Sequence, residues 1–484
     1  MTFWELESLR SRLNGSWLRP PGAGSVTAMG VSTDSRAVMP GQVFIALKGE
    51  RMDGHDYLGQ AASSGAALLV VDDPGKIPHD LRPGAAIVQV PDTGDALLAL
   101  AAAWRAALTG VPVVAVTGSN GKTTTTRLVE SVLRGLGPGT ASIKSFNNRI
   151  GVPLTILRAA PTDRFLVCEV GTNAIGEIAE LAAVIEPDIT VITSIGREHL
   201  EGLGGIQGSV NEAVELVRKL RPGGTVIMPS GCPELDAAIS RTPVGSGKLA
   251  GSVLRFGEGA GPQLSISAIL CDDAGVAFSL GDDRFTVPLI GRHNAHNAAA
   301  AVGVGRTLGV AGDVITACLA SAKGAEMRLE RRSITLPKGP PSIDIINDAY
   351  NANPESMLAA ISTFKDLFGA RPRRKVAVLG DMLELGEHGP DCHREIGDAL
   401  AAAGVFDLCI LIGPLMMFAA DRVNKAMGPD RVIPLPKLDE AGGMKVAEHL
   451  KPGDAVLLKG SRGMGIERVL KAIESLSLPV AGPA

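Results

Sequence analysis

The segment TGSNGKTTT, residues 117–125, has the residue types and spacing that bind nucleotide phosphates. Backbone N–H groups along the loop can surround phosphate oxygens, and the Lys122 ammonium can neutralise their charge. Thr123 stands where a hydroxyl would ligate Mg²⁺. The strict G-x-x-x-x-G-K-[ST] pattern is not met, because Val116 replaces its first glycine. The segment nevertheless predicts a phosphate-binding loop.

The flanking segments favour the same interpretation. Residues 113–116 form an apolar run typical of a buried strand, and residues 123–136 have the periodicity of a helix with one apolar face. A phosphate-binding unit requires the order strand, loop, helix. The alternative is a glycine-rich turn with an unrelated lysine, and this order disfavours it.

Two ionisable residues follow other expected strands. Glu169 ends the strand expected at 165–170, and ligands of open α/β folds collect at the carboxyl ends of strands. A magnesium-ligand role for Glu169 is therefore reasonable, although a glutamate at a strand end is often only solvated. His199 follows the strand expected at 189–193, and a lone histidine is more often a structural hydrogen-bonding residue than a functional one.

Four further segments place polar residues next to apolar runs. In GRHNAHNAA, Asn294 and Asn297 are three residues apart at an expected helix start, where they could cap the helix or contact a base edge. DAYNANPES follows the apolar run 343–346, and its Asn353-Pro354 pair marks a turn or a helix start; a solvated loop is the alternative. LGDMLELGEHG and LLKGSRGMGIERVL follow buried strands, a position suited to ligand contacts.

The elements that must position these residues indicate an α/β protein with three domains. A chain of 484 residues at about 150 per domain suggests about three. Strand and helix signals alternate up to Gly110, after which the expected parallel strands of the second domain begin. Short alternating runs over 264–287 predict antiparallel hairpins in an appended sheet. A second group of buried strands predicts a doubly wound third domain, at residues 375–379, 408–412 and 455–458. We therefore divide the chain at 1–109, 110–326 and 327–484.

Composition excludes several classes of protein. Lys and Arg number 47 against 51 Asp and Glu, a net charge of −4, and no dense basic run is present, so nucleic-acid binding is not expected. No apolar run approaches the roughly 20 residues that span a bilayer, and the N-terminus lacks a signal-peptide pattern, so we expect no membrane insertion and a cytoplasmic location. The 6 cysteines are far apart and should be reduced thiols.

Taken together, the motifs resemble the Mur ligases, the ATP-dependent amide-forming enzymes of peptidoglycan precursor synthesis. The likeness covers nearly the whole chain in order, through the segments STDSRAVMPGQVFIALKGERMDGHDY, TGSNGKTT, SFNNRIGVP, GRHNAHNAAAAV, AEMRLE, DAYNANPESM, LGDMLELGEHG and LKGSRGMGIE. The last three are characteristic of the member that adds D-alanyl-D-alanine to UDP-N-acetylmuramoyl-tripeptide. The member that adds the third residue would be expected to carry a D-x-x-H-T-P-type segment in place of DAYNANP.

The resemblance implies a role for each domain: a small N-terminal α/β UDP-binding domain, a central P-loop ATPase domain with a mostly parallel sheet, and a C-terminal Rossmann-like ligase domain. It implies that adenine contacts Asn294 and Asn297, ribose contacts Asp348, and the γ-phosphate contacts Arg328. The other ATP phosphate contacts would come from Gly118, Ser119, Asn120, Gly121, Lys122, Thr123 and Thr124.

The resemblance also implies metal and substrate contacts. Thr123 and Glu169 would hold a first Mg²⁺, and His199 would help to hold a second. Asn147 and Asn148 would lie near the tripeptide, whose third residue can be diaminopimelate or lysine. The UDP sugar would be bound by Ser32, Thr33, Asp34, Ser35, Arg36 and Lys48, with residues 53–55 nearby.

The chemistry that the resemblance implies needs no nucleophilic serine or cysteine. The terminal carboxylate of the tripeptide attacks the ATP γ-phosphate and forms an acyl phosphate, and the amine of D-alanyl-D-alanine then displaces phosphate. The enzyme mainly positions the reactants and stabilises charge, with Lys122, His199 and Arg328 as the catalytic residues. The third domain should close over the central one to exclude water. We expect the enzyme to act as a monomer.

Two other classes of protein share part of this pattern. A related amide ligase, such as the Mur ligase that adds the third residue or a folylpolyglutamate synthetase, would keep the loop but use another acceptor. A nucleotide-binding protein without enzymatic activity would bind ATP without turnover.

The sequence departs from the family at one position. After HLEGxG, Mur ligases of this type usually carry a lysine that is carbamylated by CO₂ and helps to hold the second Mg²⁺. Counting from His199 without gaps puts Ala213 at that lysine and Glu215 at the glutamate two residues later. We hypothesise that Glu212, which is three residues before Glu215 and so on the same helix face, supplies the missing negative charge. A solvated Glu212 with water in the gap is the alternative, and Lys219 is a weaker one because it needs a six-residue shift.

Overall fold

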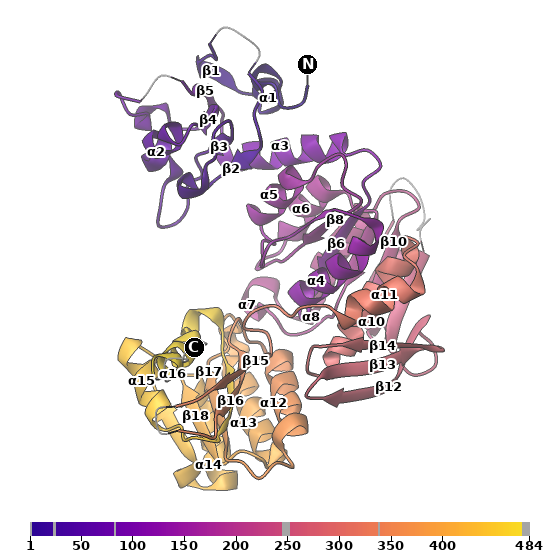
Figure 1. The fold of residues 1–484 in the computed structure, drawn as a ribbon, viewed down its shortest axis with the longest axis vertical. Helices are drawn as coiled ribbons and strands as arrows, with labels where there is room; N and C mark the ends of the chain where they lie inside the picture. The colour runs from indigo at the N-terminus through magenta and orange to yellow at the C-terminus, as the bar shows by residue number, and fades with distance from the viewer. Residues whose placement is uncertain (1, 23–25, 82–83, 244–251, 337–338, 477–484) are drawn as a thin grey trace, which may run out of the picture.

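The computed structural model describes residues 2–22, 26–81, 84–243, 252–336 and 339–476. Its strands form three sheets, which follow one another along the chain, and Figure 1 shows the first and third at opposite ends of the molecule with the second between them. The α/β class and the three-part organisation predicted from the sequence are confirmed. None of the helices in the described ranges is long and apolar enough to cross a bilayer.

The first sheet has five strands in the order β1-β5-β4-β3-β2. Four of them run parallel, and β1 pairs antiparallel with β5 at one edge. The long helix α3 (Thr93–Ala107) leaves this sheet and packs against the central domain, so a single hydrophobic cluster extends across both. The other elements are β1 (Ser16–Arg19), β2 (Val31–Ser32), β3 (Val43–Ile45), β4 (Leu68–Val71), β5 (Ala86–Gln89), α1 (Leu6–Arg12) and α2 (Leu58–Ser63).

The second sheet has nine strands in the order β14-β13-β12-β11-β10-β9-β6-β8-β7. The strands are β6 (Val113–Thr117), β7 (Thr140–Ala141), β8 (Leu166–Glu169), β9 (Ile189–Ile192), β10 (Thr225–Pro229), β11 (Ser252–Glu258), β12 (Leu264–Asp272), β13 (Gly275–Leu280) and β14 (Asp283–Val287). The helices are α4 (Lys122–Leu133), α5 (Gly151–Arg158), α6 (Glu177–Ile185), α7 (Leu200–Leu203), α8 (Ile206–Arg218), α9 (Pro233–Arg241), α10 (His293–Thr307) and α11 (Gly312–Ala320).

The hairpins predicted over 264–287 are present, but they do not form a separate sheet. β12 pairs in parallel with β11, so the antiparallel strands β13 and β14 extend the central sheet. The apolar face of these hairpins packs against α10 and α11, and that burial favours a continuous sheet over a detached one.

The third sheet has six strands in the order β15-β16-β20-β17-β18-β19, all parallel except β15. The strands are β15 (Glu330–Ile334), β16 (Ile343–Asp348), β17 (Lys375–Gly380), β18 (Leu408–Ile412), β19 (Val432–Leu435) and β20 (Ala455–Lys459). The helices are α12 (Pro354–Phe368), α13 (Gly389–Ala403), α14 (Met416–Met427), α15 (Glu440–Glu448) and α16 (Glu467–Ser475). Helices on both faces bury the central strands, as in doubly wound folds.

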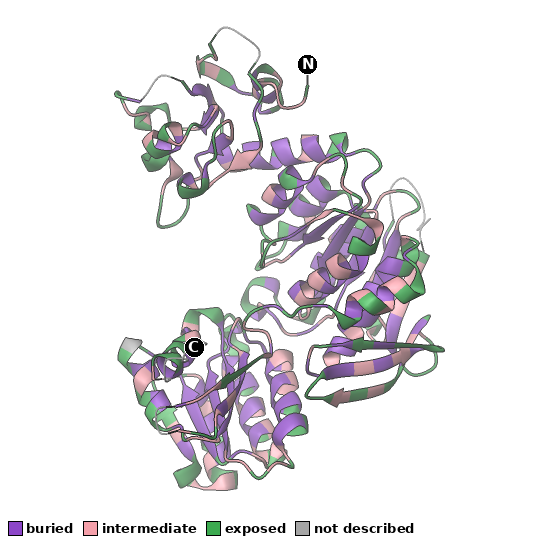
Figure 2. Cartoon of the chain, viewed as in Figure 1, coloured by how far each residue is buried: buried purple, intermediate pink, exposed green. Residues whose placement is uncertain are grey.

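The strand register of the second sheet brings distant loops together. β6 lies between β8 and β9, with Val116 paired to both Glu169 and Val191. The carboxyl ends of these three parallel strands therefore meet at one edge, and the segments that follow them share a single site. Figure 2 shows these strands as buried ribbon, because their apolar residues are covered on both faces.

Candidate active site

A cavity of about 1040 Å³ lies where the three domains meet. Residues of the phosphate-binding loop, the loop after β9, the start of α10 and the loops of the C-terminal domain line it, and the first domain contributes residues such as Lys48. Of the predicted site residues, the cavity lining includes Lys48, Ser119, Asn120, Gly121, Lys122, Thr124, Asn147, Asn148, Glu169, His199, Asn294, Asn297, Arg328 and Asp348.

Two glycines give the loop after β6 its shape. Gly118 has φ +125° and Gly121 has φ +87°, conformations that other residues rarely adopt. A Cβ atom on Gly118 would lie 2.5 Å from Thr193 Oγ1, and one on Gly121 would lie 2.4 Å from Asn297 Oδ1. Gly121 is also the N-cap of α4 and provides no side-chain cap, so the first amides of this helix remain available to an anion.

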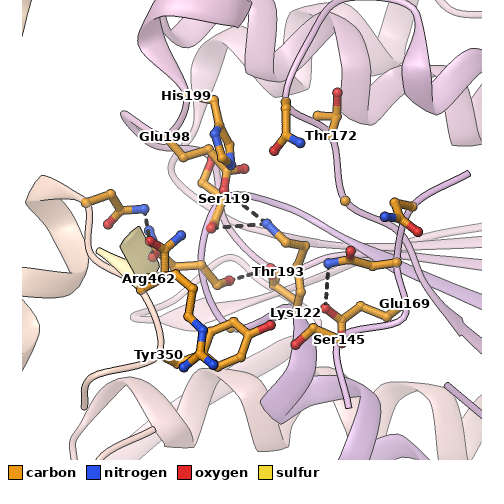
Figure 3. Close-up of a pocket in the computed structure, with 18 of the residues that line it drawn as sticks. Ser119, Lys122, Ser145, Glu169, Thr172, Thr193, Glu198, His199, Tyr350 and Arg462 are labelled. Atoms are coloured by element: carbon orange, nitrogen blue, oxygen red, sulfur yellow. Dashed lines mark hydrogen bonds and ion pairs between the residues drawn. The ribbon is translucent and has the colours of Figure 1, made fainter. Parts of the chain in front are cut away.

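Lys122 is held inside the loop. Its Nζ donates hydrogen bonds to the carbonyl oxygens of Gly118 (2.6 Å) and Ser119 (3.3 Å), and it forms an ion pair of 3.0 Å with Glu198 Oε2. Figure 3 shows Lys122 pointing toward Ser119 and Glu198. The ammonium therefore lies against the loop backbone, where it can neutralise a phosphate bound by the loop.

Side-chain oxygen atoms of Thr123, Ser145 and Glu169 lie close together at the start of α4. Thr123 Oγ1 donates to Glu169 Oε1 at 3.0 Å and lies 3.3 Å from Ser145 Oγ, and Asn147 Nδ2 also donates to Glu169 Oε1 at 2.9 Å. Glu169 Oε2 is buried and has no hydrogen-bond partner among the described residues. A hard cation prefers a carboxylate and hydroxyl oxygens, and Mg²⁺ is usually bound by one or two carboxylates together with substrate phosphates. These residues therefore fit a magnesium ion.

Electrostatics agree with a cation at this place. Burial raises the pKa of Glu169, and the nearby Arg328 guanidinium, the Thr123 hydroxyl and Lys122 oppose that shift. An unpartnered buried carboxylate oxygen is costly, and a divalent cation would compensate that cost.

The start of α10 faces the loop. Asn294 Nδ2 donates to the Ile290 carbonyl at 2.8 Å, and Asn297 Nδ2 donates to Asn294 Oδ1 at 2.9 Å. Thr125 Oγ1 donates to Asn297 Oδ1 at 3.2 Å. Neither asparagine is the N-cap of α10, which is Arg292. The two amides therefore form a linked pair in the cavity wall beside the loop, and the capping alternative is wrong.

The same wall contains a histidine that the sequence did not single out. His293 lines the cavity, and burial lowers its pKa to about 4, while Asp348 acts in the opposite direction. Its imidazole is therefore neutral near pH 7 and can both donate and accept a hydrogen bond.

The C-terminal domain contributes Asp348 at the end of β16. Its Oδ2 accepts from Lys459 Nζ at 2.6 Å, and its Oδ1 accepts from the backbone N–H of Leu329 at 3.0 Å. Arg328 lies between the domains, and its Nη2 donates to Thr123 Oγ1 at 2.9 Å. Asn353 begins α12 as its N-cap, in a capping box with Ser356, which agrees with the predicted helix start.

The segment after β9 carries three ionisable residues in succession. Arg197 pairs with Glu355 and Glu395 of the C-terminal domain, both at 2.7 Å, and Glu198 pairs with Lys122. His199, whose φ is +46°, hydrogen-bonds through Nδ1 to Glu384 of the C-terminal domain. This segment therefore contacts the phosphate-binding loop and the C-terminal domain together.

The predicted substrate residues fall into two groups. Asn147 and Asn148 line the cavity, and Asn148 Oδ1 also accepts from the N–H groups of Ile150 and Gly151 at the start of α5. Lys48 lines the cavity from the first domain. The remaining residues lie outside the cavity lining. They run from the end of β2 into a short turn that Asp34 caps and in which Arg36 pairs with Asp34: Ser32, Thr33, Asp34, Ser35 and Arg36.

The structure contradicts the placement of two predicted metal ligands. Glu212 is buried, and its two carboxylate oxygens accept from the N–H groups of Gly176 (2.7 Å) and Ile178 (3.0 Å) at the start of α6. Glu215 pairs with Arg218 at 3.0 Å on its own helix. Neither lines the cavity with His199. Among the described residues, no three His, Cys, Asp or Glu side chains are grouped as a metal site.

Sequence reasoning also missed residues that the structure places in the site. Glu198, Lys459, Tyr350 and Ser145 line the cavity, and each contacts a residue that the motifs had identified. Tyr350, Lys459 and Ser145 belong to segments that carry the motifs, so their position in the motif was the available signal. For Glu198 the signal was its position directly before His199.

The fold and the cavity define a three-domain α/β protein with a phosphate-binding loop at the junction of its domains. Family models match each part: the Mur ligase family catalytic domain over residues 27–105, the Mur ligase middle domain over 116–305, and the Mur ligase glutamate ligase domain over 327–462.

Individual proteins agree with this assignment. The UDP-N-acetylmuramoyl-tripeptide--D-alanyl-D-alanine ligase of Bacillus subtilis is 35% identical, over 91% of this chain and 92% of that protein. The crystal structure of MurF from Acinetobacter baumannii has a TM-score of 0.82 at 29% identity and covers 97% of this chain and 99% of its own. MurF ligase from Thermotoga maritima in complex with ADP has a TM-score of 0.74 at 28% identity, covering 93% of this chain and 97% of its own. The chain belongs to the Mur ligase family, and it is an enzyme of the ligase class.

Proposed function

We propose that the chain is an ATP-dependent amide ligase that joins D-alanyl-D-alanine to UDP-N-acetylmuramoyl-tripeptide and so forms the pentapeptide precursor of peptidoglycan. The observation that carries the proposal is that a single cavity joins the phosphate-binding loop to residues of the first and third domains. Curated relatives of that specificity match over most of this chain, which supports the choice of substrates.

The nucleotide half of the cavity suits ATP. Lys122 and the amides at the start of α4 bind the phosphates. Arg328 contacts the γ-phosphate from the hinge, the segment 321–329 that links α11 of the central domain to β15 of the C-terminal domain. The amides of Asn294 and Asn297 meet the adenine, and Asp348 meets the ribose. Thr123 and Glu169 would hold a Mg²⁺ ion, which supplies charge neutralisation for the phosphates when it is bound.

The reaction has two steps. A carboxylate oxygen of the tripeptide attacks the γ-phosphorus of ATP, and the bond between that phosphorus and the oxygen bridging to the β-phosphate breaks. ADP departs, and the tripeptide now carries an acyl phosphate. The amine nitrogen of D-alanyl-D-alanine then attacks the acyl carbon, and phosphate leaves as the nitrogen loses a proton. Lys122 and Arg328 stabilise the negative charge on the transferred phosphoryl group.

The C-terminal domain protects the acyl phosphate from water. Several of its contacts with the central domain are polar and close to the loop: Asn353 Nδ2 donates to Asn120 Oδ1 at 3.0 Å, and Arg197 binds Glu355 and Glu395. Such contacts can form and break as substrates enter and products leave. We place the reaction in the cytoplasm and expect a monomer to carry it out.

The test is phosphate release by the purified protein with ATP and Mg²⁺. We expect release to require the UDP-tripeptide and D-alanyl-D-alanine together, and parallel assays with diaminopimelate- and lysine-containing tripeptides will identify the third residue. Single amino acids serve as the matched control acceptors and should be poor. Faster turnover with a free diamino acid on the UDP-dipeptide would instead assign the neighbouring step of the pathway, and nucleotide binding without any turnover would exclude an enzyme.

A further inference from the structure

Arg328 lies in the hinge between the central and C-terminal domains, in an unusual backbone conformation. Its two neighbours, Met327 and Leu329, have φ values of +55° and +49°. Bulky L-residues rarely adopt this left-handed region, and two of them on either side of a single residue indicate a backbone that the surroundings force into place. Strain of this kind is typical of functional sites.

Side chains of the C-terminal domain hold the bend. Glu330 Oε2 accepts from the backbone N–H of Met327 at 3.0 Å, and Asp348 Oδ1 accepts from that of Leu329 at 3.0 Å. The backbone N–H of Tyr350 donates to the Met327 carbonyl at 3.2 Å. These bonds fix the direction in which the Arg328 side chain leaves the hinge.

The far end of that side chain rests on an aromatic ring. The Arg328 Cζ atom lies 4.3 Å from the centroid of the Tyr350 ring, a distance at which the ring face attracts a guanidinium. Arg462 lies farther from the same ring, with its Cζ at 5.8 Å, and Figure 3 shows Tyr350 and Arg462 next to each other in the cavity wall. From this position Arg328 reaches Thr123 of the phosphate-binding loop.

We propose that Tyr350 is a positioning residue that acts through Arg328: its ring holds the guanidinium over the phosphate-binding loop so that it meets the γ-phosphate of ATP. The inference rests on the proposed function, because that function gives Arg328 a γ-phosphate to contact. It predicts that Tyr350 matters for nucleotides that carry a γ-phosphate and not for ADP.

The test compares dissociation constants of the full-length protein for ADP and for the β,γ-imido analogue of ATP, each with Mg²⁺. Tyr350→Phe keeps the ring face and should bind both nucleotides within about twofold of the unchanged protein. Tyr350→Leu removes the ring and should weaken binding of the analogue by roughly tenfold, a value between those of an exposed and a desolvated cation–π contact, while ADP binding stays within about twofold. If the leucine variant folds poorly, Tyr350→Met is a second variant without the ring, and its unbranched, flexible side chain can fill the space differently.

Two comparisons make the test specific. Phe418→Leu removes a ring that lies 4.8 Å from Arg394 Cζ, outside the cavity lining, and should change neither constant. In an Arg328→Gln background, Tyr350→Leu should cause no further loss, because the ring then has no guanidinium to hold.

Three results would overturn the proposal: equal weakening of ADP and the analogue, no weakening of either, or a full additional loss in the Arg328→Gln background. The first would mean that Tyr350 contacts the part of the nucleotide common to both. These constants are measured without peptide substrates. Failure to ligate D-alanyl-D-alanine would therefore refute the proposed function, but the nucleotide-binding comparison could still be interpreted.

Discussion

Replacing Lys122 with alanine probes both the phosphate-binding loop and the ion pair inside it. The Lys122 and Glu198 side chains are only 16% and 11% exposed, and the 3.0 Å pair is one of three contacts of the ammonium. In the alanine variant the Glu198 carboxylate would lose this partner while its side chain stayed largely buried. An exposed pair contributes at most about 1 kcal/mol, and breaking a fully buried one costs about 3–5 kcal/mol. We therefore expect a loss of about 2 kcal/mol in the free energy of unfolding.

The effect on catalysis should be larger. Lys122 is proposed to place a fixed positive charge on the phosphates, and removal of one such preorganised group typically lowers kcat by about 10²–10³. The assay is phosphate release with saturating substrates, together with thermal unfolding of the same samples. For a domain of the size of the central one, a loss of about 2 kcal/mol lowers the transition by about 4–8 °C.

Glu198→Gln separates the two effects. Combined with Lys122→Ala, it replaces the unpaired carboxylate with a neutral amide, so it should restore most of the lost stability and none of the lost turnover. A folded Lys122→Ala protein with turnover within tenfold of the unchanged enzyme would refute the phosphate-binding role. A stability loss that persists in the double variant would refute the reasoning about the pair.

Three further outcomes follow from the site. Glu169→Gln should remove the cost of a buried charge, so its free energy of unfolding without Mg²⁺ should be unchanged or higher. Mg²⁺ with ADP should stabilise this variant less than it stabilises the unchanged protein. An equal stabilisation by Mg²⁺ would exclude Glu169 as a ligand. Gly121→Ala places a Cβ atom 2.4 Å from Asn297 Oδ1 at a φ of +87°, so it should lose about 1–3 kcal/mol in the free energy of unfolding and also bind nucleotide more weakly. Its control is Gly309→Ala, at φ +78° in open space, which should show only the backbone cost and keep its nucleotide affinity. The pKa of His293 is lowered to about 4 in the folded protein, so between about pH 6.5 and pH 4 the unfolded chain binds more protons than the folded one. Stability should therefore fall as the pH is lowered through this range. The melting temperature of His293→Gln should fall less over the same range.

Local patterns in the sequence predicted most of the parallel strands. The apolar runs at 113–116, 189–193 and 408–412 correspond to β6, β9 and β18 within one residue, because a strand buried on both faces needs an unbroken apolar run. The hairpins over 264–287 were also predicted as hairpins. Their membership of the central sheet was not, because it depends on the pairing of β12 with β11, which no local pattern encodes.

The site shows the same division between local and distant information. Gly121 and Lys122 were recognisable because the loop that binds phosphate is contiguous in sequence. Tyr350 and Arg328 are 22 residues apart, and the ring contact between them accompanies a bend of the hinge at Met327 and Leu329, whose φ values are positive. Backbone strain of this kind comes from the surroundings and has no signature in residue type, so the aromatic partner could not be predicted.

The error at Glu212 has a physical cause that helical spacing cannot reveal. Spacing of three residues places Glu212 and Glu215 on neighbouring positions of α8, but it does not say which element that face meets. The face of Glu212 meets the start of α6, where the N-cap Gly176 supplies no side-chain oxygen and free N–H groups need an acceptor. A carboxylate at a helix N-terminus satisfies those donors and the helix dipole together, so Glu212 is fully engaged there. The carboxylate that reaches Lys122 is Glu198, which precedes His199 in the loop after β9. The prediction that Glu212 and Glu215 supply negative charge beside His199 is therefore wrong, because both carboxylates are engaged elsewhere.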